Sequence, residues 1–247
     1  VRAYIVRECC QAPSNFRCEG TLASYLKAQN VIGLCGVDTR ALTRAIRENG
    51  VMNGIITDSK TLTPAQQALL DSYEVRGAVQ AVTTPEVRRY EAEGAQKHRV
   101  ALWDFGTKRS LIQALRQRGC QVTVWPAGST AVEILADEPE GIVLSEGPGD
   151  PAAEPALTHQ IAQLCQAKRP VLGVGLGHEL LALSQGAKTY RLKHGHRGAN
   201  QPVKDLATGR VRATSQNHGY VVDSESVQAP GRVCLVNVND GTCAGIV

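Results

Sequence analysis

The chain has 247 residues, enough for one large domain or two ordinary ones, each with its own hydrophobic core. Its formal net charge is only +4, the Lys and Arg residues are interspersed with acids, and there are just two Phe and two Trp, so composition argues against a nucleic-acid-binding surface. The sequence contains neither a long apolar run nor a signal-peptide pattern, and we therefore expect a cytoplasmic protein that does not enter a membrane.

Eight cysteines are scattered along the chain without a C-x-x-C pair and without a histidine at metal-ligand spacing. We therefore expect reduced, mostly buried thiols and no metal site. The sequence does not begin with Met, and its last five residues resemble a strand cut in the middle, so we expect a fragment that lacks both ends.

The first 85 residues are predicted to be part of a small mixed α/β domain. A helix is expected at 21–29 with Thr21 as its N-cap, and a second at 38–48 between Asp38 and the helix-ending Gly50. An apolar strand at 31–37 separates them, and Thr63 and Pro64 begin a further helix.

A polar stretch from Thr83 to Arg99 has no apolar face and contains a proline, which is typical of an interdomain connection. We predict a linker at residues 86–98. A larger domain is then expected at residues 99–247.

In this larger region strands alternate with helices. Strands are predicted at 100–104, 121–125, 141–144 and 171–174, and helices at 108–118, 131–136, 155–167 and 178–184. This order predicts an α/β fold with a doubly wound, mostly parallel sheet covered on both faces. Beyond Tyr190 we expect strands and turns, with turns at 195–200 and 215–220.

Two glycine-rich turns, at 146–151 and 173–177, follow predicted strands and should lie side by side where such sheets bind ligands. The second resembles the strained strand-turn-helix elbow that presents a Ser or Cys nucleophile above a helix N-terminus. Its tip is Gly175, which has no side chain and cannot form a covalent intermediate.

Two other interpretations of the elbow compete with this one. A dinucleotide-binding loop is disfavoured because His178 stands where the third glycine belongs, and no acid ends the strand at 189–192. A purely structural tight turn remains open. A sharper hypothesis is an oxyanion hole built from backbone N–H groups of 147–149 and of Leu176. A loop carrying Asn217, His218 and Tyr220 would grip a small polar ligand.

An ordered series of segments carries a family resemblance. The segments are Ser14–Arg17, Asp38–Thr43, Asn53–Gly54, Trp103–Arg109, Ser145–Pro151, Pro170–Leu183, Gly186–Thr189, Gly195–Val203 and Ser215–Tyr220. In this order they resemble the small subunit of glutamine-hydrolysing carbamoyl-phosphate synthetases, with its class I glutamine amidotransferase domain. The resemblance covers essentially the whole chain.

The resemblance implies a glutaminase with a Cys-His-Glu triad that passes ammonia through a tunnel to a large subunit. That partner would bind ATP and a divalent metal and make carbamoyl phosphate for arginine and pyrimidine biosynthesis, and this chain would need no cofactor of its own. The implied glutamine pocket consists of Gly147, Gly149, Leu176, Glu179, Asn217, Gly219 and Tyr220. Gly175 falls on the nucleophilic cysteine, and the triad His and Glu would lie beyond Val247.

Three positions depart from the family pattern. Gly175 lacks the thiol, Glu179 replaces a Gln that hydrogen-bonds glutamine, and Glu146 replaces the usual Asn. Neither Cys165 nor Cys243 is placed to substitute for the nucleophile. We expect Glu179 to add a negative charge stabilised by the helix N-terminus.

The resulting hypothesis is a subunit of a carbon–nitrogen ligase whose own glutaminase step is lost and whose glutamine binding is weak or lost. The alternative is a non-catalytic structural or regulatory partner of an ammonia-dependent large subunit.

Overall fold

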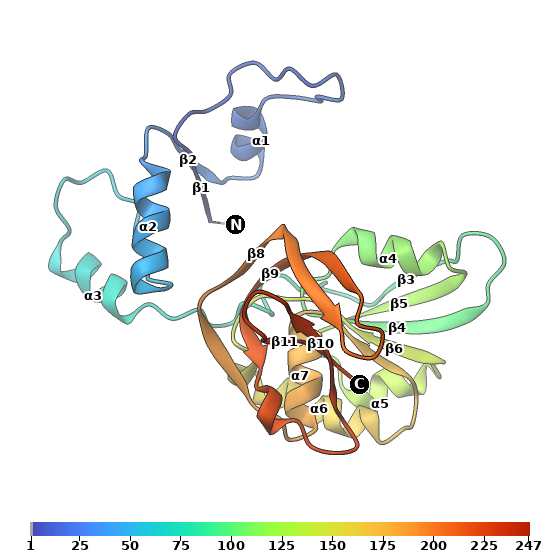
Figure 1. Ribbon diagram of the computed structural model, residues 1–247. Coiled ribbons are helices and arrows are strands. Elements are labelled where there is room, and N and C mark those ends of the chain that lie inside the picture. Colours follow the sequence, from blue (N-terminus) through green and yellow to red (C-terminus); the bar gives the residue numbers. More distant parts are fainter. Residues whose placement is uncertain (1) are drawn as a thin grey trace. The chain divides into compact units, whose positions relative to one another are not determined.

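The computed structural model describes residues 2–247, which divide into one unit up to Thr61 and another from Leu62 onwards (Figure 1). Within the described residues no helix has the length and apolarity that a membrane crossing requires. Each unit is described by itself below.

The first unit contains two helices and a small sheet. Its elements are β1 (Ala3–Ile5), α1 (Leu22–Ala28), β2 (Ile32–Leu34) and α2 (Thr39–Asn49). β1 and β2 are parallel. The Thr21 side chain accepts the N–H of Ser24, and the Asp38 carboxylate accepts two N–H groups of the first turn of α2. Both predicted caps are thus confirmed, because each satisfies helix donors that have no partner within the helix.

The second unit is built on a five-stranded sheet in the order β3-β5-β4-β6-β7. Its strands are β3 (Arg88–Tyr90), β4 (His98–Asp104), β5 (Cys120–Pro126), β6 (Gly141–Leu144) and β7 (Val171–Gly173). β3 is an antiparallel edge strand, and the other four strands are parallel. This confirms the predicted α/β fold with a mostly parallel sheet.

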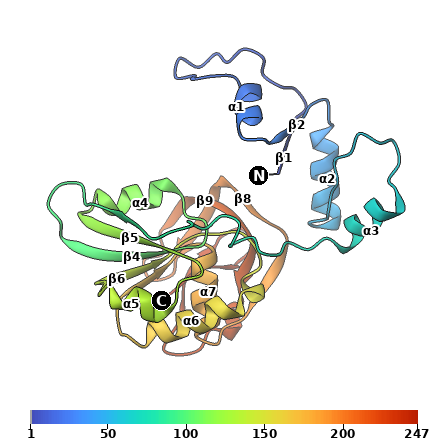
Figure 2. The same cartoon turned by 180° about the vertical axis from the view of Figure 1, so that it is seen from behind.

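Helices cover both faces of this sheet (Figures 1 and 2). They are α4 (Arg109–Arg116) on one face and α5 (Ala131–Ala136), α6 (Pro155–Cys165) and α7 (Leu176–Ser184) on the other, with a short 3-10 turn, η1 (Pro151–Ala153), before α6. A further helix, α3 (Pro64–Ser72), precedes the sheet in the chain and does not cover it. One apolar core lies against α4 and contains Leu102 and Val122. The other lies against α5, α6 and α7 and contains Trp103 and Leu180. Alternate residues of β4 therefore face opposite cores, as the two-residue period of a strand requires.

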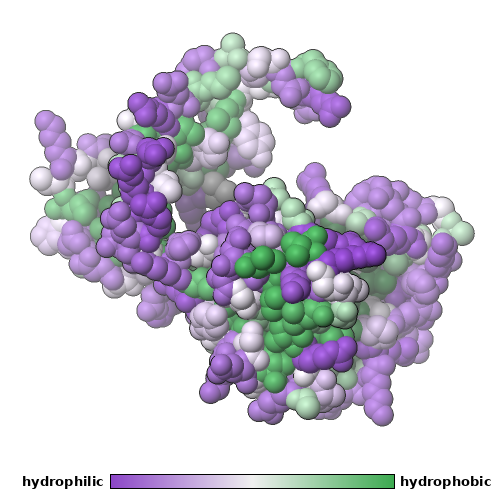
Figure 3. Space-filling model, in the orientation of Figure 1, coloured by the Kyte–Doolittle hydropathy of each residue, from purple (hydrophilic) through white to green (hydrophobic). Residues whose placement is uncertain are grey.

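A second, antiparallel sheet follows in the order β11-β10-β8-β9. Its strands are β8 (Thr189–Asp205), β9 (Val211–Val222), β10 (Val233–Asn237) and β11 (Cys243–Ile246), with a second 3-10 turn, η2 (Ser224–Ser226), after β9. Ala182 of α7 packs in one buried cluster with Val222 and Cys243. Apolar residues gather on the surface over β10 and β11 (Figure 3).

Three segments that the sequence predicts to be a linker or turns form strands in the structure, in part or in full. The segment 83–99 is not a free connector, since β3 pairs with β5 and Thr84 N–H donates to the Asp104 carboxylate at 2.7 Å. The segments 195–200 and 215–220 are not turns or loops but lie inside β8 and β9. They pair with each other through a ladder with bulges, which long-range pairing creates and local composition does not reveal.

The cysteines also differ from the expectation of mostly buried thiols. All eight are free, but only Cys120 and Cys243 are buried. The small first unit leaves its cysteines exposed or half-buried, because it contains no buried apolar core among the described residues.

Candidate functional site

The elbow joins β7 to α7 at the carboxyl edge of the sheet. Gly175 is the N-cap of α7, with φ 55° and ψ −119°, and it is exposed. The N–H of Val174 donates to Leu144 O, and that of Gly177 donates to Ser145 O, both at 3.0 Å. These bonds hold the elbow against the end of β6, so the two glycine turns lie side by side as predicted.

The space around the elbow explains its glycines. A Cβ atom on Gly173 would come within 2.7 Å of the backbone at His178, so only glycine lets strand and helix approach this closely. A Cβ atom on Gly175 would stand 3.2 Å from Glu146 Cβ, and its positive φ disfavours other residues. Gly175 therefore sits at an open tip that faces the neighbouring turn.

The neighbouring turn is fixed by buried polar contacts. Ser145 Oγ accepts the N–H of Phe105 at 2.9 Å and donates to Glu146 O at 2.8 Å. Glu146 Oε1 accepts the N–H of Lys108 at 3.1 Å, whereas its Oε2 is buried without a partner. The turn is thus held rigidly to both β4 and β6.

Three backbone donors are unused at this edge. Among the described residues, the N–H groups of Gly147, Gly149 and Leu176 donate to no protein acceptor. A Cβ atom on Gly147 would lie 2.8 Å from a methyl group of Leu176, so these two residues are close neighbours. Unused N–H groups at a helix N-terminus attract an oxygen that carries negative charge. An oxyanion hole remains a prediction that this geometry suits.

The environment of Glu179 contradicts the expectation that this residue adds a negative charge to the site. Its side chain is only 6% exposed and makes no hydrogen bond or ion pair to the described protein. Burial and, to a lesser extent, the Asp150 carboxylate raise the pKa of Glu179 to about 8. At pH 7 most molecules therefore carry the neutral acid, and the expected negative charge is wrong. Desolvation outweighs the helix dipole here, although Glu179 lies in the first turn of α7.

The remaining predicted site residues lie on β9. Tyr220 approaches Asp150, and burial together with that carboxylate raises the pKa of its hydroxyl. Asn217 is exposed and pairs with Arg197 of β8, and Gly219 lies beside the same arginine. The structure therefore groups Tyr220 with Glu179 and places Asn217 and Gly219 along the β8–β9 ladder.

His218 has two protein partners. Its Nδ1 lies 2.7 Å from Tyr220 O and its Nε2 lies 3.0 Å from Gln216 Oε1. Burial lowers the pKa of this imidazole. With both ring nitrogens occupied, His218 supports the strand and is not positioned as a free base.

The sequence reasoning missed Asp150 and His178. Asp150 interacts with both Tyr220 and Glu179, and its Oδ1 accepts the N–H of Ala152 at 2.9 Å. The sequence could have indicated Asp150, because this acid directly follows the glycine turn Gly147-Pro-Gly149. His178 Nε2 is buried without a partner, and burial lowers the pKa of the ring. The position of His178, three residues after Gly175, did not indicate in the sequence that its side chain belongs to the site.

Neither Cys165 nor Cys243 is suited to replace the missing nucleophile. Burial raises the pKa of both Cys165 and Cys243, which reduces the fraction of thiolate. Within residues 2–247 no cluster of His, Cys, Asp and Glu side chains is suited to hold a metal ion.

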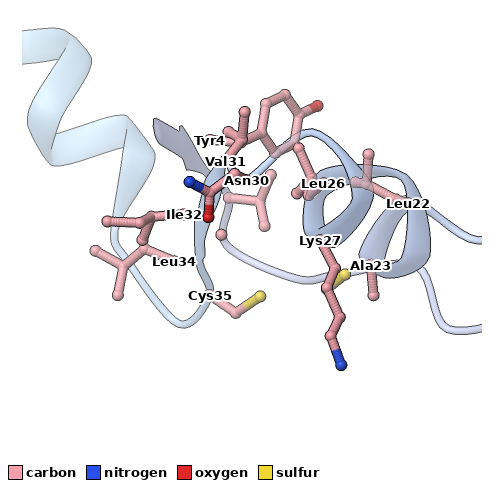
Figure 4. A pocket seen from close by; sticks show the side chains of 13 residues that line it. Tyr4, Leu22, Ala23, Leu26, Lys27, Asn30, Val31, Ile32, Leu34 and Cys35 are labelled. Carbon is pink, nitrogen blue, oxygen red and sulfur yellow. The ribbon is translucent and has the colours of Figure 1, made fainter. Parts of the chain in front are cut away.

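A cavity of about 420 Å³ lies elsewhere, in the first unit, between α1 and β2 (Figure 4). Its lining is mainly aliphatic, with Leu22 and Leu26 on α1, and Lys27 is its only charged side chain. This lining offers no acid–base pair, so we assign no reaction to it.

Comparisons with known proteins agree across the chain. Residues 101–247 match the family described as glutamine amidotransferase class-I, and residues 1–56 match the carbamoyl-phosphate synthase small chain, CPSase domain. The carbamoyl phosphate synthase small chain of Clostridium perfringens is 46% identical over 247 residues, covering 100% of this chain and 69% of that protein. The corresponding small chain of Symbiobacterium thermophilum is 42% identical over 254 residues, with coverage of 100% and 69%.

Solved structures support the fold. A glutamine amidotransferase from Thermotoga maritima aligns with a TM-score of 0.51 and 19% identity, over 61% of this chain and 71% of that one. At this identity the likeness concerns the fold alone.

Proposed function

The chain belongs to the carbamoyl phosphate synthase small-chain family, and we propose that it acts as the small chain of such an enzyme although its own site no longer hydrolyses glutamine. In this proposal the chain pairs with a large chain that carries out the ATP-dependent steps. The nitrogen then comes from free ammonia.

The observation that carries the proposal is Gly175 at the tip of an intact elbow. The donors expected around a tetrahedral intermediate are free at Gly147 and Leu176, and the elbow is held by backbone hydrogen bonds to β6. A covalent glutaminase step needs a nucleophilic atom at the tip, and glycine supplies none. Cys165 and Cys243, whose thiol pKa values are raised, do not compensate.

Carbamoyl phosphate formation by the assembled full-length small and large chains tests this function. We expect product with an ammonium salt, and neither product nor glutamate release with glutamine. Glutamine-dependent product at a rate comparable to that with ammonium would contradict the proposal. Gly175→Cys, alone and with Glu179→Gln, then tests whether the missing thiol accounts for the loss, provided that the full-length chain supplies a triad His and Glu.

The second candidate is a structural or regulatory partner without a role in the reaction. The elbow is held by backbone hydrogen bonds to the end of β6 although its tip has no nucleophile, which favours a turn kept for its packing alone. Comparing the ammonium-dependent rate of the large chain with and without this subunit separates the two. An unchanged rate favours the second candidate.

A further inference from the structure

Two of the eight cysteines meet in the first unit, which does not contain the elbow. Cys9 and Cys35 both line the cavity between α1 and β2 (Figure 4). Cys35 is exposed and Cys9 is half-buried, so a small molecule in the solvent can reach both thiols. The cavity offers no acid–base pair, but two neighbouring thiols have a chemistry of their own, which is oxidation to a disulfide.

Backbone pairing brings the two cysteines together. β1 and β2 are parallel, and their pairing continues past the strand ends, where the N–H of Gly36 donates to Arg7 O at 2.9 Å. Cys35 directly precedes Gly36, and Cys9 follows Arg7 by two residues. Paired chains of a sheet lie about 4.8 Å apart, and a disulfide joins Cα atoms that are about 4.4–6.8 Å apart. The two cysteines thus lie on chains whose spacing suits a disulfide.

The side chains agree with this placement. Burial raises the pKa of the Cys9 thiol, and the Cys35 thiol adds to this effect through its proximity and a hydrogen bond between the two groups. The thiols of Cys10 and Cys18 donate to backbone carbonyl groups two residues further on, at 3.3 and 2.9 Å, and neither lines the cavity. Cys9 and Cys35 are therefore the pair that the fold of this unit selects.

We propose that Cys9 and Cys35 form a redox-active site that exchanges with small disulfides, such as oxidised glutathione, and closes into an intramolecular disulfide. The thiolate of the exposed Cys35 attacks one sulfur of the small disulfide and expels the other half, which takes up the proton and leaves as a thiol. Cys9 then attacks the Cys35 sulfur of this mixed disulfide and releases the second half in the same way. Two electrons and two protons pass from the pair to the small disulfide, and excess thiol reverses the reaction.

The disulfide would act as a staple for the first unit. It would enclose α1, which lies between the two cysteines in the sequence, and no apolar side chain of this unit is buried among the described residues. Small units with a weak core gain stability from such cross-links. Tryptic cleavage after Lys27, at the end of α1, should therefore be slower in the oxidised chain than in the reduced one, and equal rates would contradict the staple.

The test maps the disulfide in the whole chain. The reduced protein is incubated with oxidised glutathione, its remaining thiols are blocked with N-ethylmaleimide, and it is digested with trypsin without reduction. Because trypsin cleaves after Lys and Arg, Cys9 lies in peptide 8–17 and Cys35 in peptide 28–40. We expect mass spectrometry to find these two peptides joined, and to find them separate again after reduction.

Variants and an unfolded control identify the pair. Peptide 8–17 also contains Cys10, so Cys10→Ser is the matched control and should still give the joined peptides, whereas Cys9→Ser and Cys35→Ser should not. The folded wild type should form the joined peptides about tenfold or more faster than the wild type unfolded in urea, because the fold holds the two thiols together. This second comparison does not depend on the folding of any variant.

Three outcomes overturn the inference. They are glutathione adducts without joined peptides, joined peptides in Cys9→Ser at the yield of the wild type, and equal rates of joining in the folded and the urea-unfolded chain. The proposed loss of glutaminase activity does not bear on this result, because the elbow belongs to the second unit.

Discussion

Restoring a side chain at the elbow tip should destabilise the second unit. In Gly175→Cys the new Cβ enters a residue with φ 55° and stands 3.2 Å from Glu146 Cβ and 3.5 Å from its Cα. A non-glycine residue in such a backbone region costs about 1–3 kcal/mol. Contact with Glu146 adds to this, because its backbone is held by the rigid turn. We expect the free energy of unfolding to fall by about 1–3 kcal/mol or slightly more.

Two matched variants separate the causes of this loss. Gly186→Cys has a positive φ of 86° but no atom within 4 Å of its new Cβ, so it reports backbone strain alone. Gly128→Cys has neither a positive φ nor a close neighbour. We expect Gly128→Cys to be about as stable as the wild type, Gly186→Cys to be less stable, and Gly175→Cys to be the least stable of the four proteins.

Urea unfolding followed by tryptophan fluorescence is the suitable assay. Trp103 lies in the core of the second unit and the half-buried Trp125 packs against that core, so the signal reports on that unit. The variants should share the urea dependence of the wild type and differ in midpoint. If Gly175→Cys unfolds at the same midpoint as Gly128→Cys, the elbow tip is not strained and the reasoning is refuted.

Two further predictions concern buried acids. Glu179 has a folded-state pKa of about 8 against an ordinary value of 4.5, so its contribution to stability is full below about pH 4.5 and is lost as pH rises through about 8. As the pH rises from 5 to 8.5, the free energy of unfolding of the wild type should therefore fall by about a few kcal/mol relative to that of Glu179→Gln. Urea unfolding of both proteins at both pH values measures this difference. If both proteins lose the same stability over this range, the reasoning is contradicted. Asp104 is 4% exposed and accepts the N–H groups of Thr84, Gly106 and Thr107 at 2.7, 2.9 and 2.7 Å. Asp104→Ala should lower the free energy of unfolding by about 3–5 kcal/mol in the same assay. Asp104→Asn keeps one acceptor oxygen and should lower it clearly less. Equal losses in the two variants would show that these hydrogen bonds do not decide the stability of the turn.

Much of the fold follows from local sequence. Thr21, Asp38 and Thr63 each supply an N-cap before a helix, and all three cap the helix as predicted. Caps act over three residues, so sequence alone reveals them. The predicted strands of the parallel sheet were also found, since apolar runs between helical segments indicate buried strands.

What local sequence did not reveal depends on partners far along the chain. Residues 88–90 are polar and were expected in a linker, yet they form an edge strand because β5 offers a free edge. The glycine-rich segment around Gly195 forms part of β8 because β9 pairs with it. Composition suggests turns at such places, and the pairing overrides it.

The sequence by itself determined the elbow, its missing nucleophile and the family, because each depends on residue identity in a fixed order. Only the tertiary structure decided the state of Glu179. Glu179 is far along the chain from Asp150 and Tyr220, so the sequence does not reveal that these residues lie near one another. The position of Glu179 near a helix N-terminus, taken alone, suggested a charged group. Packing of η1 and β9 against α7 removes water from this carboxyl group, and desolvation makes it a neutral acid without a partner.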